Sequence, residues 1–471
     1  MLCDFYELTM GNGYYRNGFY KRNVYFDVFF RNVPDGGGFA IAAGLEQIVE
    51  YIQQLHFSDD DIAYLRGKGI FDEGFLNYLK NFKFHGDIYA VPEGTPVFPG
   101  EPLLTVRAPA IEAQLIETYL LLEINHQSLI ATKTNRIVQA ANGKPVSDFG
   151  ARRAHNVDAA VYGARAAYIG GAAGTATVLA GKMFHIPISG TMAHSWVMTF
   201  DSEYDAFKAY AESYPDGTVL LVDTYDVLKS GVPNAIRTAR EVLEPMGKKL
   251  IGIRLDSGDL AYLSKEARKM LDEAGLPDCM IVASNSLDEY TISSLNRQGA
   301  KIDSYGVGER LITSSSTPVF GAVYKLVAIQ KDGKFIPKIK ISETAEKITN
   351  PGIKEVYRVY DENGKAVADY LAVKGEQIRD FEPVRYVDPV NYWKNRSFVG
   401  CRFKKLQVPV FEKGKRIYDL PDIEEIRQYV KDQLENEIWE EEQRFENAHT
   451  HYLDMSPAMF ELKMSLLHEE N

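Results

Sequence analysis

The strongest constraint on the fold is a regular alternation of short apolar strands with amphipathic helices between Pro145 and Leu326. Seven segments have the length and the β-branched, apolar content of strands: 146–149, 186–189, 219–222, 250–254, 280–283, 302–305 and 319–326. The segments between them mostly have the periodicity of helices, for example 263–274. This alternation is typical of α/β proteins with a parallel sheet or barrel.

Polar residues follow these strands at the point where each strand ends. The polar segments are 148–152, 191–195, 223–224, 254–259, 284–285 and 306–308. In barrels the carboxyl ends of the strands form the face that carries the chemistry. The pattern therefore favours an irregular TIM-like (β/α) barrel over an open sheet, with one active site at that face.

The regions before and after the predicted barrel do not show this alternation of strands and helices. Before the barrel come a helix, an aromatic strand at 24–30, short strands separated by Pro and Gly over 86–106, and a long helical segment over 111–140. After it, a hairpin is expected between 356–360 and 366–373. We expect three domains: an N-terminal α/β sandwich over 1–125, the catalytic barrel over 126–330, and a C-terminal extension over 331–471 that packs on both.

The composition excludes several classes of function. The net charge of -12 disfavours a nucleic-acid partner, because phosphate backbones need a dense basic surface. No apolar run approaches the roughly 20 residues that span a bilayer, and the N-terminus lacks the pattern of a signal peptide. Three widely spaced cysteines argue against a disulfide framework. A cytoplasmic protein without a membrane partner is expected.

His194 is the main catalytic candidate. It stands at a strand end, flanked by Thr191 and Ser195, where a neutral imidazole could attack a phosphoryl group or act as a general base. A histidine with satisfied hydrogen bonds in the core is the ordinary alternative. His155 is the competing candidate, close to an arginine pair.

Arginines and carboxylates occur at the same ends. Arg152 and Arg254 could grip a phosphate or a carboxylate with two hydrogen bonds, or they could form a structural network with Asp148, Asp256 and Asp259. Magnesium usually binds one or two carboxylates together with substrate phosphates. The sequence allows Mg²⁺ at Asp256 and Asp259, without a dedicated metal cage.

A phosphate site is expected beside them. Gly306 and Gly308 follow the sixth strand, and glycine loops in late barrel positions often hold phosphates with backbone N–H groups. An ordinary turn is equally typical of a glycine pair. Ser284 and Asn285, at the preceding strand end, add side-chain donors.

Six ordered motifs together resemble the nicotinate phosphoribosyltransferase family, of the superfamily that also contains the nicotinamide and quinolinate enzymes. The motifs are DFYELTM at Asp4–Met10, FFRNVPDGGGF at Phe29–Phe39 with AGLE at Ala43–Glu46, DFGARR at Asp148–Arg153, GTMAHS at Gly190–Ser195, RLDSGD at Arg254–Asp259, and the Gly306 loop. The resemblance implies an N-terminal α/β sandwich of the hammerhead-like kind, an irregular barrel, and a homodimer with shared active sites. It also implies ATP as a co-substrate and Mg²⁺ as a cofactor.

The resemblance also implies roles for individual residues. His194 resembles the histidine that ATP phosphorylates, and Asp256 and Arg254 stand beside it as catalytic residues. The expected nicotinate site consists of Tyr6 from the partner subunit, Phe149, Gly190, Thr191 and Arg254. The expected phosphoribosyl pyrophosphate site consists of Arg152, Ser284, Asn285, Gly306, Gly308 and Thr349.

Four alternatives remain at this point. A quinolinate phosphoribosyltransferase would need extra basic groups for a second carboxylate. A non-catalytic nucleotide-binding protein would not explain why arginines, carboxylates and a histidine gather at one set of strand ends. A nicotinamide phosphoribosyltransferase is disfavoured because Ala176 stands where a carboxylate is expected to accept a hydrogen bond from the amide. A barrel lyase or aldolase acting on a sugar phosphate could use the same Gly306 loop, but no lysine falls at a predicted strand end. The expected reaction is therefore the ATP-coupled condensation of nicotinate with phosphoribosyl pyrophosphate in the salvage of NAD.

Overall fold

The chain divides into two units, Met1–Leu129 with Val319–Asn471, and Ile130–Pro318. The computed structural model describes residues 1–344, 347–393 and 395–469. Both units mix helices with sheets, so the expected α/β class is confirmed. Across the described residues, no helix combines the length and the apolarity that a bilayer crossing requires.

The first unit is built around a seven-stranded sheet in which all hydrogen-bonded neighbours are antiparallel. In sheet order its strands are β13 (Lys334–Pro337), β12 (Val323–Lys331), β1 (Asn23–Phe29), β5 (Leu104–Pro109), β3 (Asp87–Ala90), β19 (Val408–Glu412) and β20 (Lys415–Arg416). The apolar residues of β1, β3 and β5 lie in one large hydrophobic core. Helices α1 (Phe5–Arg16), α2 (Leu45–Gln54) and α4 (Glu73–Lys80) contribute buried residues to the same core.

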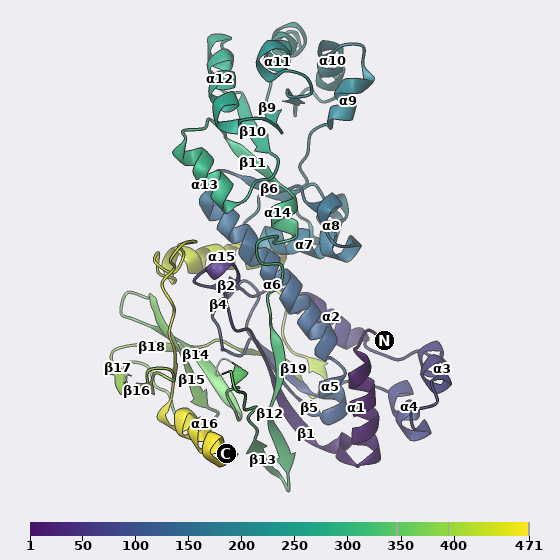
Figure 1. Ribbon diagram of the computed structural model, residues 1–471, viewed down its shortest axis with the longest axis vertical. Helices are drawn as coiled ribbons and strands as arrows, with labels where there is room; N and C mark the ends of the chain where they lie inside the picture. The colour runs from purple at the N-terminus through teal and green to yellow at the C-terminus, as the bar shows by residue number, and fades with distance from the viewer. Residues whose placement is uncertain (345–346, 394, 470–471) are drawn as a thin grey trace. The chain divides into compact units, whose positions relative to one another are not determined.

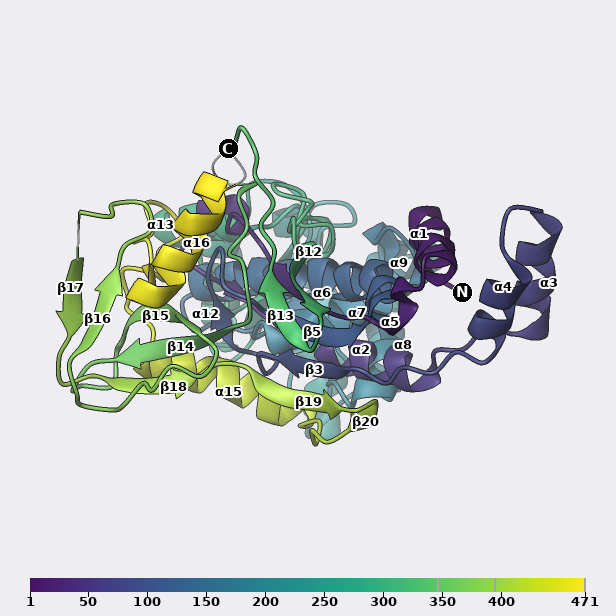
Figure 2. The ribbon, with the colours of Figure 1, turned by 90° about the horizontal axis from the view of Figure 1, so that it is seen from below.

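A second sheet of the first unit comes almost entirely from the C-terminal region. In sheet order it contains β17 (Asn395–Phe398), β16 (Val384–Val387), β21 (Leu453–Met455), β15 (Ala366–Val373), β14 (Lys354–Tyr360) and β18 (Arg402–Lys405). The predicted hairpin is confirmed, because β14 pairs antiparallel with β15. The last helix, α16 (Pro457–Glu469), packs on β15 and β16 (Figure 2).

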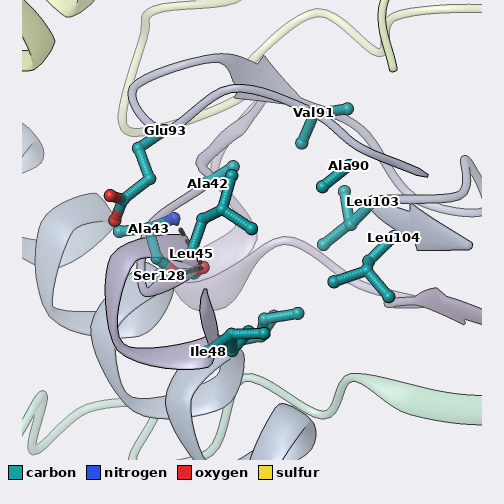
Figure 3. Close-up of a pocket in the computed structure, with 11 residues that line it drawn as sticks. Ala42, Ala43, Leu45, Ile48, Ala90, Val91, Glu93, Leu103, Leu104 and Ser128 are labelled. Carbon is teal, nitrogen blue, oxygen red and sulfur yellow. Dashed lines mark hydrogen bonds between the residues drawn. The ribbon is translucent and has the colours of Figure 1, made fainter. Parts of the chain in front are cut away.

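The first unit also contains a small apolar cavity, which Figure 3 shows. Its walls come from α2 and the two residues before Gly44, from the end of β3 and the chain after it, from the start of β5, and from α6 (Glu117–Ala140). Its polar side chains, Glu93 and Ser128, bind the backbone. Glu93 Oε1 accepts the N–H of Gly44 at 2.6 Å, and Ser128 Oγ accepts the N–H of Ala43 at 3.1 Å. A carboxylate at the start of α2 stabilises the helix dipole. These polar groups hold the chain together, and the cavity has no feature of a substrate site.

The second unit contains a parallel sheet of six strands, part of which Figure 1 shows with its helices. In sheet order the strands are β7 (Gly174–Thr175), β6 (Val146–Asp148), β11 (Ser304–Val307), β10 (Met280–Ser284), β9 (Gly252–Leu255) and β8 (Val219–Leu221). The larger helices between them are α7 (Val157–Ile169), α10 (Glu203–Ser213), α12 (Leu260–Glu273) and α13 (Glu289–Arg297). The predicted strands at β6, β8, β9, β10 and β11 are therefore confirmed.

Two of the predicted barrel strands are different in the structure. The segment 186–189 makes only an isolated bridge between Ile188 and Thr175. The predicted last strand at 319–326 is wrong, because β12 starts at Val323 and pairs antiparallel with β1 and β13 in the first unit. An apolar run predicts a strand but does not specify its neighbours, which are set by contacts far apart in the sequence. The apolar content of this segment serves the core of the antiparallel sheet.

Candidate active site

The carboxyl ends of the parallel strands bring most of the predicted polar residues to one edge of the sheet. Asp148 ends β6, Ser284 ends β10, and Asp223 comes two residues after β8. Arg254 lies within β9, one residue before the end of the strand. Because the carboxyl ends of parallel strands lie at the same edge of the sheet, these residues gather at that edge.

His194 lies at this edge, in contact with the neighbouring strand ends. It is the first residue of α9 (His194–Thr199), and its side chain is 40% exposed. Its Nδ1 atom lies 3.1 Å from Oγ1 of Thr224, within hydrogen-bonding distance. Its Nε2 atom lies 3.8 Å from Oδ2 of Asp256 and 4.0 Å from Oδ1 of Asp223. The imidazole is therefore oriented by a hydroxyl on one side and faces two carboxylates on the other.

Asp223 fixes the loop that follows β9. Its side chain is almost fully buried, and Oδ2 accepts hydrogen bonds from the N–H of Asp256 at 2.9 Å and from Oγ of Ser257 at 2.6 Å. Its Oδ1 atom is buried and accepts no hydrogen bond from the described residues. Oδ1 faces His194, so Asp223 combines a structural contact with an oxygen available to the site.

Asp256 and Asp259 have different surroundings. Asp256 Oδ1 accepts a short hydrogen bond from the hydroxyl of Ser284, and its Oδ2 faces His194. Asp259 caps α12, because its Oδ1 accepts the N–H groups of Ala261 at 3.1 Å and Tyr262 at 3.0 Å. Among the residues that the structure describes, no group of three or more His, Cys, Asp or Glu side chains is arranged to hold a metal ion.

Arg254 provides a buried positive charge with an unused donor. Its Nη1 donates to Oγ1 of Thr191 at 2.6 Å, and its Nη2 donates to the carbonyl of Met192 at 3.0 Å. Burial lowers the pKa of the guanidinium, the charge of Arg152 lowers it further, and Asp256 and Asp223 partly oppose this. Its Nε–H is buried and finds no acceptor within the described parts of the chain. An anion in front of Arg254 would satisfy that donor.

Phe149 and Gly306 are in close contact. A Cβ atom added to Gly306 would lie 2.3 Å from Cε2 and 2.4 Å from Cδ2 of the Phe149 ring, far inside van der Waals distance. Gly308 is similarly close to the backbone, because its Cβ would lie 3.1 Å from the carbonyl oxygen of Phe149. The two glycines thus allow Phe149, at the end of β6, to pack directly against the end of β11. This places Phe149 at the same edge of the sheet as the other candidate residues.

Asp148 has a structural role within the sheet. It is fully buried, its Oδ1 accepts the N–H of Gly150 at 2.8 Å, and its Oδ2 accepts the hydroxyl of Thr175 at 2.7 Å. Burial raises its pKa, and these two hydrogen bonds oppose the rise. In the described structure Asp148 therefore does not take part in the charge network with the arginines that the sequence left open as an alternative. Arg153 lies 3.6 Å from Glu309 instead.

The other predicted residues are more varied in position. Gly190 is open to solvent, and Asn285 has a positive φ of 87° in the turn after β10. Tyr6 and Thr349 belong to the first unit. Tyr6 is 43% exposed on α1, and Thr349 is 1% exposed, with Oγ1 accepting the N–H of Lys340 at 3.0 Å.

The sequence predicts Thr224 at a strand end but indicates no role for it. Its contact with His194 joins residues 30 positions apart, and the sequence signal was only its place directly after Asp223. Thr175 was missed as the partner of Asp148, because β7 is two residues long and has no strand periodicity to recognise.

Comparison with known proteins decides the family. Three domain families match the chain in order: the nicotinate phosphoribosyltransferase (NAPRTase) N-terminal domain over residues 1–125, the NAPRTase family over 145–363, and the NAPRTase C-terminal domain over 353–463. The chain belongs to the nicotinate phosphoribosyltransferase family. The predicted resemblance is thereby confirmed.

Individual relatives agree over almost the whole length. Nicotinate phosphoribosyltransferase of Bacillus subtilis is 47% identical over 467 residues, which cover 99% of this chain and 94% of the relative. The Caenorhabditis elegans enzyme of the same name is 34% identical, with 99% and 93% covered. Among solved structures, human nicotinic acid phosphoribosyltransferase matches with a TM-score of 0.89 at 28% identity, covering 99% of this chain and all of that one.

Another solved structure is similar over most of the chain. The structure titled nicotinate-nucleotide pyrophosphorylase from Pyrococcus furiosus matches with a TM-score of 0.70 at 26% identity, and 92% of this chain and 95% of that chain are covered. The full-length nicotinate phosphoribosyltransferase relatives leave the lyase, aldolase and nicotinamide alternatives without support.

Proposed function

We propose that the chain condenses nicotinate with phosphoribosyl pyrophosphate to form nicotinate mononucleotide and pyrophosphate, and that it couples this reaction to ATP hydrolysis through a phosphorylated His194. It is an enzyme of NAD biosynthesis, because its full-length relatives are named nicotinate phosphoribosyltransferases. The observation that supports the site assignment best is the position of His194, between Thr224 and the carboxylates of Asp223 and Asp256.

The proposed nicotinate site lies in front of Arg254. The Nε–H of Arg254 has no acceptor in the described structure, so the carboxylate of nicotinate would satisfy it while Thr191 holds the guanidinium in place. Phe149, seated on Gly306, provides an aromatic face for the pyridine ring. Tyr6 of a partner subunit is proposed to complete the sandwich, and Gly190 leaves space for the ring.

The proposed phosphoribosyl pyrophosphate site uses Arg152, Ser284, Asn285, Gly306 and Gly308 of the second unit, and the expected contact from Thr349 stays a prediction. Glycine backbone and hydroxyl donors suit phosphate oxygens, and Arg152 is exposed without a carboxylate ion pair among the described residues. The Asp256 carboxylate has an oxygen facing the site, and Asp259 has one oxygen that its helix cap does not use. These two side chains would hold Mg²⁺, which when bound neutralises the charge of the leaving pyrophosphate.

His194 is proposed to carry the phosphoryl group. A neutral imidazole nitrogen attacks the γ-phosphorus of ATP, an N–P bond forms, and the bond to the bridging oxygen breaks so that ADP leaves. Water later cleaves the N–P bond and releases phosphate. The phosphorylated side chain would place negative charge beside Asp256, where it can favour binding of a cation and with it phosphoribosyl pyrophosphate.

The finer architecture is also a proposal. We infer that the six-stranded parallel sheet of the second unit curves into an irregular (β/α) barrel. We also infer the three domains 1–125, 126–330 and 331–471, with β12 paired in the sheet of the first unit and outside the barrel. The active sites of a homodimer would be shared, since Tyr6 is assigned to the partner's pocket. Three free cysteines agree with a cytoplasmic location.

Intact-mass measurement tests the phosphohistidine directly. After incubation with Mg-ATP, the wild-type chain is expected to gain one acid-labile phosphate, which is lost again when nicotinate and phosphoribosyl pyrophosphate are added. The His194→Ala variant is expected to gain none and to lose the dependence of its rate on ATP. An unchanged ATP-coupled rate in His194→Ala would rule out this role. A preference for nicotinamide or quinolinate over nicotinate would overturn the substrate assignment.

A further inference from the structure

A buried carboxylate outside the substrate pocket links the two segments that meet at His194. Glu203 is the first residue of α10 and is 4% exposed. Its Oε2 atom accepts a short hydrogen bond from the hydroxyl of Ser230 and a second, at 2.9 Å, from Nδ2 of Asn234. Its Oε1 atom is buried and has no hydrogen-bond partner among the described residues. Burying a carboxylate with one oxygen unpartnered lowers the free energy of unfolding, so the presence of Glu203 at this position needs an explanation.

The first of the two segments carries His194. Helix α9 is followed within a few residues by α10, and Nε1 of Trp196 donates to the carbonyl of Ala206 at 3.1 Å. The Trp196 ring also packs edge-on against Tyr210, with centroids 6.0 Å apart. Because Trp196 holds α9 against α10 through these contacts, a shift of α10 is expected to move the His194 imidazole as well.

The second segment carries Thr224. Asp226, two residues further on, accepts the N–H groups of Leu228 at 3.1 Å and Lys229 at 2.9 Å and so starts a π-helical turn over Val227–Gly231. π-Helical turns are rare and occur frequently at functional sites. Gly231 closes this turn against the end of β8, since a Cβ there would lie 1.8 Å from the carbonyl oxygen of Val222. The turn is thus tightly fixed to the strand end that presents Thr224.

Glu203 joins these two segments, because its partners Ser230 and Asn234 lie in the π-helical turn and in α11 (Val232–Thr238). We propose that Glu203 is a positioning residue for the phosphorylation step. It holds α9 and α10 against the turn after β8, and thereby keeps the Thr224 hydroxyl within hydrogen-bonding distance of Nδ1 of His194. The inference rests on the proposed role of His194. It assigns Glu203 no contact with substrate.

The contact between Nδ1 of His194 and Oγ1 of Thr224 matters because it orients the ring. In the tautomer that carries its proton on Nδ1, this N–H donates to the Thr224 hydroxyl oxygen and leaves Nε2 free to react. A displacement of a few tenths of an ångström would weaken the bond and allow the ring to turn. Loss of the Glu203 contacts is therefore expected to impair phosphorylation of His194 more than the transfer of the ribose.

The test compares Glu203→Gln and Ser230→Ala with a matched control, Glu241→Gln. Glu241 also accepts from α10, through the hydroxyl of Tyr204 at 2.7 Å, but its side chain is 51% exposed and its other partner is Arg237. In both test variants, the phosphohistidine formed per minute with Mg-ATP is expected to fall about tenfold, as expected for loss of one buried hydrogen bond to a charged group. The control is expected to match the wild type. If Glu203→Gln does not fold, Ser230→Ala decides the outcome alone.

A second readout separates positioning from general stability. The ¹⁵N chemical shifts of the His194 ring, recorded without ATP, are expected to change in Ser230→Ala and to stay constant in Glu241→Gln. Unchanged ring shifts and wild-type phosphorylation in the foldable test variant would overturn the inference and leave the proposed function standing. Failure of the wild-type chain itself to take up phosphate would instead refute the proposed function and, with it, the inference.

Discussion

Nδ1 of His194 lies 3.1 Å from the hydroxyl oxygen of Thr224, so the proposed phosphoryl acceptor is oriented by a neutral side chain. The carboxylates of Asp223 and Asp256 lie on the opposite side of the ring, at 4.0 and 3.8 Å from Nε2. This arrangement combines a fixed ring orientation with negative charge beside the nitrogen that Thr224 does not contact. It makes Thr224 a residue whose hydroxyl can be tested alone.

Replacing Thr224 with valine keeps the shape of the side chain and removes the hydroxyl. Formation of phosphohistidine is expected to slow about tenfold, because loss of one partly buried hydrogen bond costs about 1.4 kcal/mol. Quench-flow measurement of acid-labile phosphate checks this. Thr224→Ser retains the hydroxyl and should keep most of the rate. Equal phosphorylation of the valine variant and the wild type would contradict a role for the hydroxyl.

Gly306→Ala is expected to weaken nicotinate binding through the Phe149 ring. The new Cβ would lie 2.3 Å from Cε2 of the ring, so the ring or the strand end must move. Overpacking of this kind usually costs about 1–3 kcal/mol, so the KM for nicotinate is expected to rise about tenfold or more. Gly217→Ala is the control, because no atom lies within 4 Å of its Cβ position. A KM for nicotinate equal to that of the wild type would show that the Phe149 ring does not contact the substrate.

The positions of β6, β8, β9, β10 and β11 were predictable because each of them lies in a short, largely apolar run between helical segments. The candidate site was predictable for a related reason, since Asp223, Arg254 and Ser284 all lie at or next to the ends of those strands. The direction of each strand is set by the alternation with helices, which fixes the edge at which polar residues gather.

The sequence could not predict which strands pair with each other or which side chains bond to each other. The pairing of β12 with β1, and of Asp148 with Thr175, joins residues far apart in the chain, and local periodicity contains no information about such contacts. The N-cap role of Asp259 was likewise not part of the prediction, and its possible part in binding Mg²⁺ stays a prediction. A carboxylate directly before a helix is a common N-cap, and its Oδ1 is used in that way here.

Arg254→Lys is expected to lose nicotinate recognition while it retains positive charge. The guanidinium uses two nitrogens to hold Thr191 and Met192 and has a third donor free, and an ammonium group cannot reproduce this fixed geometry. We expect kcat/KM for nicotinate to fall about a hundredfold, or about 2.7 kcal/mol, as for loss of charge-assisted hydrogen bonds. The KM for phosphoribosyl pyrophosphate should change much less. A parallel rise of both KM values would place Arg254 in the phosphate site instead.

The stability of the first unit is expected to decrease with rising pH because of His451. This imidazole is buried and stacked on Phe98, with Nδ1 2.9 Å from Oε1 of Glu442 and Nε2 3.6 Å from Oδ1 of Asp369. Burial alone would lower its pKa, but the negative charges of Asp369 and Glu442 and the hydrogen bond with Glu442 raise the pKa above its usual value of 6.5. The folded state therefore binds more protons than the unfolded state above about pH 6.5.

This contribution is fully present below pH 6.5 and is lost as the pH rises through the raised pKa of the folded state. Glu101 acts in the same direction, because burial and the nearby charge of Asp369 raise its pKa well above 4.5. In His451→Gln, the free energy of unfolding in urea should decrease less steeply between pH 6 and 9, by up to about 1.4 kcal/mol per pH unit. The variant should also be less stable at pH 6, where the wild-type imidazole is charged and paired. Parallel pH profiles for the two proteins would show that His451 is neutral in the folded state, with Asp369 held by Arg358 alone.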